Sequence, residues 1–295
     1  MNKYFEKLPF ADQILKGIGQ IMLQENRWTG LLIIAGLFIG GWQYGVAAIA
    51  ATATGTISAR LLKYDLKEIN AGLYGFSPAL VGIALVFLFE SNALLWFLII
   101  IAGILAAVIQ HLFINQKIPA YTFPFIVVTW AFFFFLKPYL EVSPSELNQS
   151  TFGRGQFNYF LAMTNGFGEV MFQEKILAGI IFLIAVYISN PVAAWYGSAA
   201  SLLGAVLSKI NNQPIDQIQL GLFGFNAVLT AIAFSEDKQG GWLWVLTGTV
   251  ITIVIHNLLI DFHVLDKAGG VLTFPFVAGT WITLLIKKIF KYLFG

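Results

Sequence analysis

The chain reads Gly72-Leu73-Tyr74-Gly75-Phe76, and it reads Gly221-Leu222-Phe223-Gly224-Phe225 at a distance of 221 − 72 = 149 residues further on. A second signature, Met22-Leu23-Gln24-Glu25, returns at the same distance as Met171-Phe172-Gln173-Glu174. Two signatures in the same order and at the same spacing predict that one unit of the chain has been duplicated.

A third signature extends the duplication toward the end of each copy. Thr122-Phe123-Pro124-Phe125 returns as Thr273-Phe274-Pro275-Phe276, now 273 − 122 = 151 residues away, so a small insertion separates the second and third signatures. In membrane proteins such a duplication usually places the substrate site where the two copies meet near the middle of the bilayer.

Composition indicates the membrane. Hydrophobic residues make up 58% of the chain and charged residues 11%, against about 45–50% and about 25% in soluble domains. Long segments carry no formal charge, for example 28–59, 91–116, 118–136 and 242–257, and about 20 apolar residues suffice to cross the hydrocarbon layer. Because these runs are continuous and do not alternate, they predict membrane-spanning helices rather than a β-barrel.

Other features exclude several classes of protein. The scattered charges of the first residues argue against a cleavable signal peptide, and the chain contains no cysteine, which rules out disulfides. A net charge of +2 gives no reason to expect a nucleic acid partner. Motifs for a nucleophile, a phosphate loop or a metal site are missing from the sequence, so we expect neither an enzyme nor a cofactor or metal.

The duplicated glycine-rich segments predict the topology. Residues 72–89 and 221–234 are short and interrupted by small residues, which is typical of discontinuous helices that line a transport site. If each enters and leaves by the same face, every copy crosses the membrane five times, and an odd count inverts the second copy. We therefore expect an all-α protein of ten spans, with a first repeat over 1–140, an extracellular connection over 141–165 and a second repeat over 166–295.

Basic residues near both ends predict that the N- and C-termini are cytoplasmic, by the positive-inside rule. Lys3, Lys7 and Lys16 lie at one end and Lys287, Lys288 and Lys291 at the other. Arg60, Lys63 and Lys67 fall on the outer face in this scheme, which the rule disfavours; Asp65 and Glu68 among them reduce that conflict.

Ionisable and polar groups inside apolar segments are the first candidates for a site. Glu169 is the repeat equivalent of Gln20, and both side chains offer an acceptor oxygen. Thr129 and Thr280 are another such pair; their hydroxyls either face a pathway or return to a carbonyl one turn back. The alternative for all four is an ordinary structural role. Pro124 and Pro275 are expected to free backbone carbonyls that would add acceptors.

Aromatic and aliphatic pairs accompany these polar groups. Phe76 with Leu80, and Phe225 with Leu229, are four residues apart and therefore share a helix face, although plain packing is the common fate of such residues in an apolar chain. His111 and His256 are not repeat equivalents, since 256 − 111 = 145, and we expect them near the membrane interface.

Together these motifs resemble the urea transporter family, in particular its bacterial members. The resemblance covers both copies, with Phe-Pro standing where the family usually has Leu-Pro. It implies a passive, channel-like facilitator of urea in the inner (plasma) membrane, built of two inverted five-span repeats, each with a re-entrant pore helix, and assembled as a homotrimer with one pore per protomer.

The resemblance also implies roles for residues. Gln20 and Glu169 would accept hydrogen bonds from urea N–H groups, and Thr129 and Thr280 would stand at the central constriction. Two walls would form a slot for the flat solute: Leu23, Phe76 and Leu80 on one side, and Val170, Phe225 and Leu229 on the other.

Rival functions remain at this stage. The same slot could pass ammonia, amides or water. An ion-coupled transporter would need more buried acids or bases, an ammonium channel would need facing histidines, and an aquaporin-type channel would need twin Asn-Pro-Ala turns where only Asn190-Pro191-Val192 stands. A membrane scaffold without transport would leave the paired polar residues unexplained.

Overall fold

A computed structural model describes residues 8–143, 157–236 and 241–294. Within these ranges the regular elements are all helical, and the single β contact is an isolated antiparallel bridge between Phe89 and Val142. The prediction of an all-α protein is therefore confirmed for the described residues.

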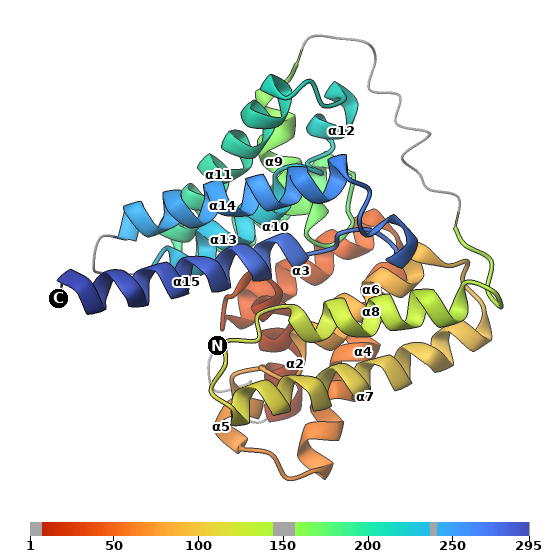
Figure 1. Cartoon of the computed structure of the whole chain (residues 1–295). Helices are drawn as coiled ribbons and strands as arrows, with labels where there is room; N and C mark the ends of the chain where they lie inside the picture. Colours follow the sequence, from red (N-terminus) through yellow and green to blue (C-terminus); the bar gives the residue numbers. More distant parts are fainter. Residues whose placement is uncertain (1–7, 144–156, 237–240, 295) are drawn as a thin grey trace. The chain divides into compact units, whose positions relative to one another are not determined.

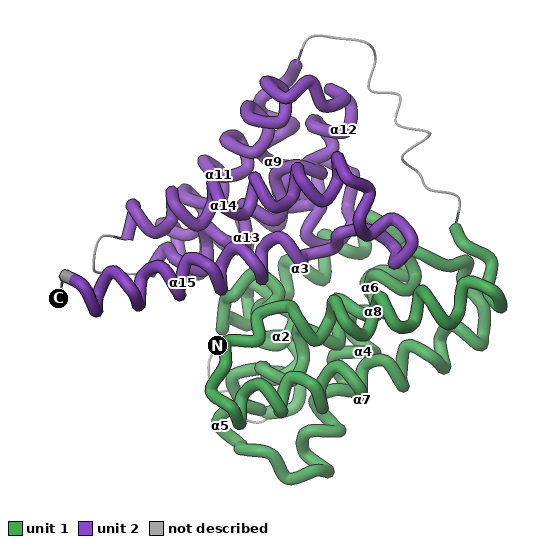
Figure 2. Tube along the Cα trace, viewed as in Figure 1, with its two compact units in different colours: residues 1–145 green, residues 146–295 purple. Residues whose placement is uncertain are grey.

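The chain divides into two compact units, Met1–Ser145 and Glu146–Gly295 (Figure 2). Residues 144–156, which make up much of the predicted connection, lie outside the described residues, and the first helix of unit 2 begins at Tyr159. Each unit is described separately below.

Unit 1 is a succession of helices linked by short turns, and its last two long helices lie side by side (Figure 1). Its elements are α2 (Pro9–Gly19), the 3-10 turn η1 (Gln20–Met22), α3 (Arg27–Gly40), α4 (Trp42–Leu61), α5 (Leu66–Asn70), α6 (Phe76–Leu88), α7 (Ala93–Asn115) and α8 (Phe123–Leu136).

Unit 2 repeats this order of long and short helices, again with its last two long helices in contact (Figure 1). Its elements are α9 (Tyr159–Glu169), α10 (Ile176–Ser189), α11 (Pro191–Ile210), α12 (Ile215–Gln219), α13 (Phe225–Phe234), α14 (Gly241–Asp261), η3 (Asp266–Ala268) and α15 (Phe274–Phe294).

Asparagine side chains begin several of these helices. Asn26 accepts hydrogen bonds from the backbone N–H groups of Trp28 and Thr29 at the start of α3, and Asn158 does the same for the first turn of α9. The first backbone N–H groups of a helix have no partner within the helix, and an asparagine at this position satisfies them. These caps fix where the apolar runs change from turn to helix.

The repeated prolines do not act as the sequence suggested. Pro124 is the second residue of α8 and Pro275 the second residue of α15. In the first turn a proline replaces an N–H that would have no helical partner, so it breaks no hydrogen bond and frees no carbonyl. The expectation of extra backbone acceptors at these prolines is wrong.

Helix length separates the elements into classes. Among the described helices, α7, α11 and α14 are long and apolar enough to cross a membrane, and α3, α6, α8, α10 and α13 are shorter apolar helices. The repeated helices α6 and α13 have 13 and 10 residues, about 20 and 15 Å at the usual rise, so neither reaches across a hydrocarbon layer of about 30 Å. Helices α2 and α9 are also short, with 11 residues each.

A glycine joint precedes each short helix. Gly72 and Gly221 have φ of +79° and +89°, a conformation that side chains disfavour. A Cβ on Gly72 would lie 2.4 Å from the backbone nitrogen of Gly17, and a Cβ on Gly221 would lie 2.4 Å from the backbone carbon of Asn165. In both units, therefore, the backbone of the turn before the short helix lies directly against the backbone of another helix. That helix is α2, which ends just before Gln20, in unit 1, and α9, which ends at Glu169, in unit 2.

Candidate functional site

Each unit gathers its own predicted site residues on three packed elements. In unit 1, η1 and α8 both pack against α6. These three elements carry Gln20, Phe76, Leu80 and Thr129, and Leu23 directly follows η1. In unit 2, α9 and α15 both pack against α13. These three elements carry Glu169, Phe225, Leu229 and Thr280, and Val170 directly follows α9. The short central helix is thus the common support of the site in both units.

The aromatic and aliphatic residues lie at the start and one turn into this central helix. Phe76 and Phe225 are the first residues of α6 and α13 and keep a small exposed surface, 5% and 7%. Leu80 and Leu229 are completely buried. Since i and i+4 lie on one helix face, each phenylalanine shares a face of its helix with a buried leucine.

The Gln20 amide donates a hydrogen bond but accepts none from the described residues. Its Nε2 donates to the carbonyl oxygen of Ala71 at 3.1 Å, in the turn just before Gly72. The described residues offer no partner to Oε1, so the hydrogen bond to Ala71 orients the side chain and leaves its acceptor oxygen available.

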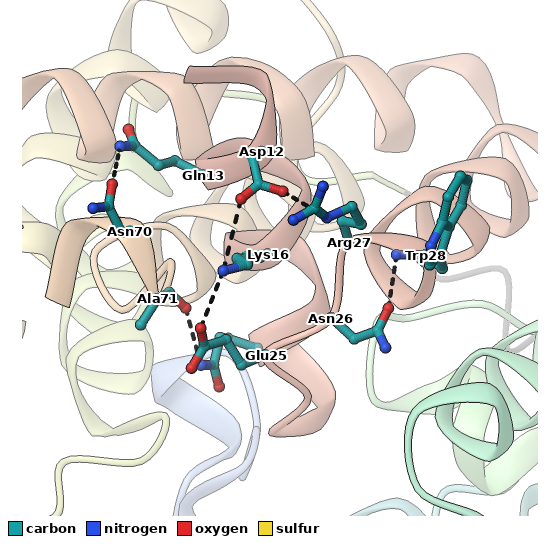
Figure 3. A network of polar contacts seen from close by, with 10 residues as sticks. Asp12, Gln13, Lys16, Glu25, Asn26, Arg27, Trp28, Asn70 and Ala71 are labelled. Atoms are coloured by element: carbon teal, nitrogen blue, oxygen red, sulfur yellow. Dashed lines mark hydrogen bonds and ion pairs between the residues drawn. The ribbon is translucent and has the colours of Figure 1, made fainter. Parts of the chain in front are cut away.

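A second amide side chain, that of Gln13, stabilises this turn through Asn70 (Figure 3). Gln13 donates from Nε2 to Oδ1 of Asn70 at 2.7 Å, and its Oε1 accepts from Nε and Nη2 of Arg60 at 3.0 and 2.6 Å. Gln13 therefore joins α2 to α4 and α5, and Asn70 is the residue before Ala71. The position of the Ala71 carbonyl, and so of Gln20, depends on this chain of bonds.

Charged residues close the hairpin around η1 (Figure 3). Arg27 contacts Asp12 at 2.8 Å, and Lys16 bridges Asp12 and Glu25 at 3.6 and 3.1 Å. These pairs are partly exposed, so each contributes little by itself. Their arrangement nevertheless ties the end of α2 to the start of α3 on either side of Gln20.

Unit 2 builds the same joint from different residues. Asn165 on α9 donates from Nδ2 to the backbone carbonyl of Gln219 at 2.8 Å, and the Gln219 side chain accepts from the backbone N–H of Asn158 at 2.7 Å. Gln219 is the repeat equivalent of Asn70, whereas Asn165 is the equivalent of Lys16. Both units thus bond an amide side chain to a backbone carbonyl in this turn, although neither the donor nor the acceptor position is the same.

Glu169 is the last residue of α9 and is 9% exposed. Its carboxylate makes no hydrogen bond or ion pair within the described ranges. Burying such a group without a partner is costly, and carboxylates in protein interiors are normally hydrogen-bonded or paired. The position therefore calls for a hydrogen-bond donor that the chain does not supply there.

Four buried helical hydroxyls have no partner in the described part of the chain, those of Ser77, Thr129, Thr249 and Thr280; of these, only Thr129 and Thr280 are repeat equivalents. Seven others among the described residues return their hydroxyl to the carbonyl four residues back: Thr52, Thr54, Ser58, Thr164, Ser198, Thr230 and Thr283. Thr129 and Thr280 are completely buried, and their hydroxyls have no partner in the described part of the chain. Since unpaired buried hydroxyls are uncommon, finding both at equivalent positions favours a shared role over the carbonyl-bonding alternative.

The repeat adds Phe172 as a further candidate wall residue in unit 2. The sequence-based prediction for unit 2 is Val170, but the repeat equivalent of Leu23 is Phe172. Leu23 and Phe172 share a left-handed backbone, with φ of 58° and 57°, and both are half-buried. The second signature, Met-Leu-Gln-Glu against Met-Phe-Gln-Glu, contains the signal that identifies Phe172.

The two histidines occupy different environments from each other. His256 is 3% exposed and bonded to Asn226 inside unit 2. His111 is half-buried; its Nδ1 lies 2.9 Å from the Tyr74 hydroxyl, and its ring is stacked on Tyr64. No group of three potential metal ligands occurs in the described residues.

These features define a helical, multi-pass membrane protein in which two units repeat one constellation of acceptor, aromatic ring and hydroxyl. The sequence model of the urea transporter family matches residues 11–288, so the chain belongs to the urea transporter family.

Curated relatives agree with this assignment. The chain is 28% identical to urea transporter 1 of Rattus norvegicus over 255 residues, which is 81% of this chain and 65% of that protein. It is 25% identical to urea transporter 1 of Capra hircus over 304 residues, which is 95% of this chain and 78% of that protein. The chain thus spans just under two thirds of the length of the rat relative.

Proposed function

We propose that this protein is a passive, channel-like facilitator of urea across the inner (plasma) membrane. The observation that carries the proposal is the repeated set of uncommitted polar oxygens: the Gln20 acceptor, the Glu169 carboxylate and the hydroxyls of Thr129 and Thr280. Each stands next to a short helix that begins with a phenylalanine whose ring keeps only a small exposed surface. Family membership supports urea as the solute.

The chemistry of urea suits this set. Urea is flat and neutral, with four N–H donors and one carbonyl, so it needs acceptors to replace the water that it leaves behind. Side-chain oxygens can replace that water step by step, as in other selectivity filters. Opposed rings, represented by Phe76 and Phe225, would accept only a flat solute. Ions gain no such compensation in an apolar slot and face a large desolvation cost.

The proposed architecture follows from the repeat. We propose two inverted repeats of five spans, divided as 1–140, 141–165 and 166–295, with α6 and α13 as the re-entrant helices and both termini cytoplasmic. The short lengths of α6 and α13 support the re-entrant assignment. The slot lies between Leu23, Phe76 and Leu80 on one wall and Val170, Phe225 and Leu229 on the other, with one slot per protomer of a homotrimer.

Stopped-flow light scattering on proteoliposomes tests the proposal. Urea, water, ammonia and formamide are compared at matched osmotic steps, with protein-free liposomes as the baseline. Rapid urea flux that follows the urea gradient alone and exceeds the flux of the other solutes is expected. If ammonia or water flux is faster and urea flux stays at the baseline, the transported solute is ammonia or water and the proposal is wrong.

A further inference from the structure

A buried side chain in unit 2 joins the proposed slot wall to the helix that carries the proposed constriction. Asn226 follows Phe225 in α13 and is 1% exposed. Its Oδ1 accepts from the backbone N–H of Phe276 at 3.0 Å, and its Nδ2 donates to the carbonyl of Leu272 at 3.1 Å. Phe276 lies in the first turn of α15, where backbone N–H groups lack helical partners, so Asn226 caps this helix from a neighbouring element.

The remaining N–H of Asn226 reaches α14. Its Nδ2 lies 3.0 Å from Nδ1 of His256. The amide orientation is fixed, because the Phe276 N–H requires an oxygen and the Leu272 carbonyl requires a donor. Since an amide nitrogen only donates, Nδ1 of His256 must accept, and the imidazole proton must sit on Nε2.

His256 in turn contacts the slot wall directly. Its ring meets the Phe225 ring nearly edge-on, with centroids 5.6 Å apart and an interplanar angle of 83°. On another side it packs against Phe223 at a centroid distance of 5.6 Å. Edge-to-face geometry is a preferred aromatic arrangement, so His256 restrains the plane of the Phe225 ring.

Unit 1 lacks this device. The repeat equivalent of Asn226 is Ser77, whose hydroxyl is buried without a partner among the described residues. A serine is too short to replace the three hydrogen bonds of Asn226. The connection of slot wall, α14 and the start of α15 is therefore particular to unit 2.

We infer that Asn226 and His256 are positioning residues for selectivity. Together they hold the Phe225 ring in one plane and fix its position relative to α15, the helix that carries Thr280. The inference rests on the proposed function, because that function places Phe225 in the slot wall and Thr280 at the constriction. A loosened ring would widen the slot for solutes with an additional methyl group while still admitting urea.

The test compares N-methylurea with urea in proteoliposomes containing the full chain. Asn226→Ser removes the three bonds, and His256→Gln keeps an acceptor for Asn226 but removes the ring from Phe225. Phe225→Ala serves as the reference for a lost wall. Thr252→Val is the matched control, because it deletes a buried hydrogen bond of 2.8 Å between α14 and Thr230 of α13 without touching Phe225.

We expect Asn226→Ser and His256→Gln to raise the N-methylurea to urea permeability ratio by about 2- to 12-fold, the range that corresponds to losing one aromatic edge contact. Thr252→Val should leave the ratio unchanged. If Phe225→Ala alters the ratio while both variants match Thr252→Val, the positioning role is overturned. A wild-type protein without urea flux would instead overturn the proposed function.

A spectroscopic readout is independent of transport. In ¹⁵N-histidine-labelled protein, the His256 signal, assigned by its loss in His256→Gln, should be that of an imidazole protonated on Nε2. Asn226→Ser should shift it toward a mixture of tautomers. A wild-type His256 with its proton on Nδ1 would refute the hydrogen bond on which the inference depends, even if the variants fold poorly.

Discussion

Two substitutions of Glu169 distinguish a role as hydrogen-bond acceptor from a role that requires negative charge. The repeat equivalent of Glu169 is Gln20, which carries no charge, so a role shared by both positions must be hydrogen-bond acceptance. Glu169→Gln keeps an acceptor oxygen of the same reach, whereas Glu169→Leu removes it. We expect the first variant to transport urea and the second to lose most of its transport.

The size of each effect follows from the environment of the side chain. Glu169 is 9% exposed and has no partner in the described residues, so in Glu169→Leu a urea N–H would pass without an acceptor. An unpaired N–H in such a site costs about 1–3 kcal/mol, which corresponds to a loss of about 5- to 150-fold in rate. Glu169→Gln exchanges a charged acceptor for a neutral one, a difference of about 1 kcal/mol, or about fivefold.

Gln20 provides the companion measurement. Because its Nε2 bonds the Ala71 carbonyl, Gln20→Glu loses that donor and leaves the side chain less well oriented. The two reciprocal exchanges should therefore be unequal, with Gln20→Glu slower than Glu169→Gln. The control is Thr249→Val, which removes a buried, unpaired hydroxyl of unit 2 outside the proposed site.

Urea flux in proteoliposomes is measured with and without proton or sodium gradients, normalised to folded protein in the membrane. Equal flux in wild type and Glu169→Leu would refute the acceptor role. Uphill accumulation of urea driven by either ion gradient and abolished in Glu169→Gln would make Glu169 a coupling carboxylate and refute the passive mechanism.

Three further substitutions test other parts of the structure. Gly72→Ala should lower thermal stability in detergent by at least about 1–2 kcal/mol, because the positive φ of this residue disfavours any side chain and the new Cβ would meet the backbone of Gly17. An unchanged melting temperature would contradict the close backbone contact between Gly72 and Gly17. Thr280→Val should raise the melting temperature and slow urea flux, because it removes an unpaired buried hydroxyl, a group that costs about 1–3 kcal/mol; a lower melting temperature with unchanged flux would indicate a structural hydroxyl. Gln13→Leu should destabilise unit 1 by about 1–3 kcal/mol. Gln13→Glu still accepts from Arg60 and should lose less; equal losses would show that the bond from Arg60 does not contribute.

The duplication was sufficient to predict the order of elements and the short central helices. Gly72 and Gly221 mark turns that only a glycine tolerates, and the sequence after each is apolar but too short to cross a membrane. Such constraints act on the local backbone, so they can be predicted from the sequence alone.

Side-chain direction could not be read in the same way. Thr129 and Thr280 resemble the other helical threonines in sequence, and only packing decides which hydroxyls turn back to the backbone. The prolines of α8 and α15 were misjudged because the helix start lies one residue before them, a boundary set by the preceding turn. The contact between His256 and Asn226 could not be read from the sequence, because the two residues are 30 positions apart in the chain.

The glycine joint of each unit has a mechanical consequence. Where backbone presses on backbone, as at Gly72 with Gly17 and at Gly221 with Asn165, no side chain can change rotamer to let one element slide past the other. The short helix and the helix beneath it should then move as one stiff piece, so permeation proceeds without rearranging this contact. The activation energy of urea flux should accordingly stay close to that of diffusion in water, and the flux should rise only gently on warming.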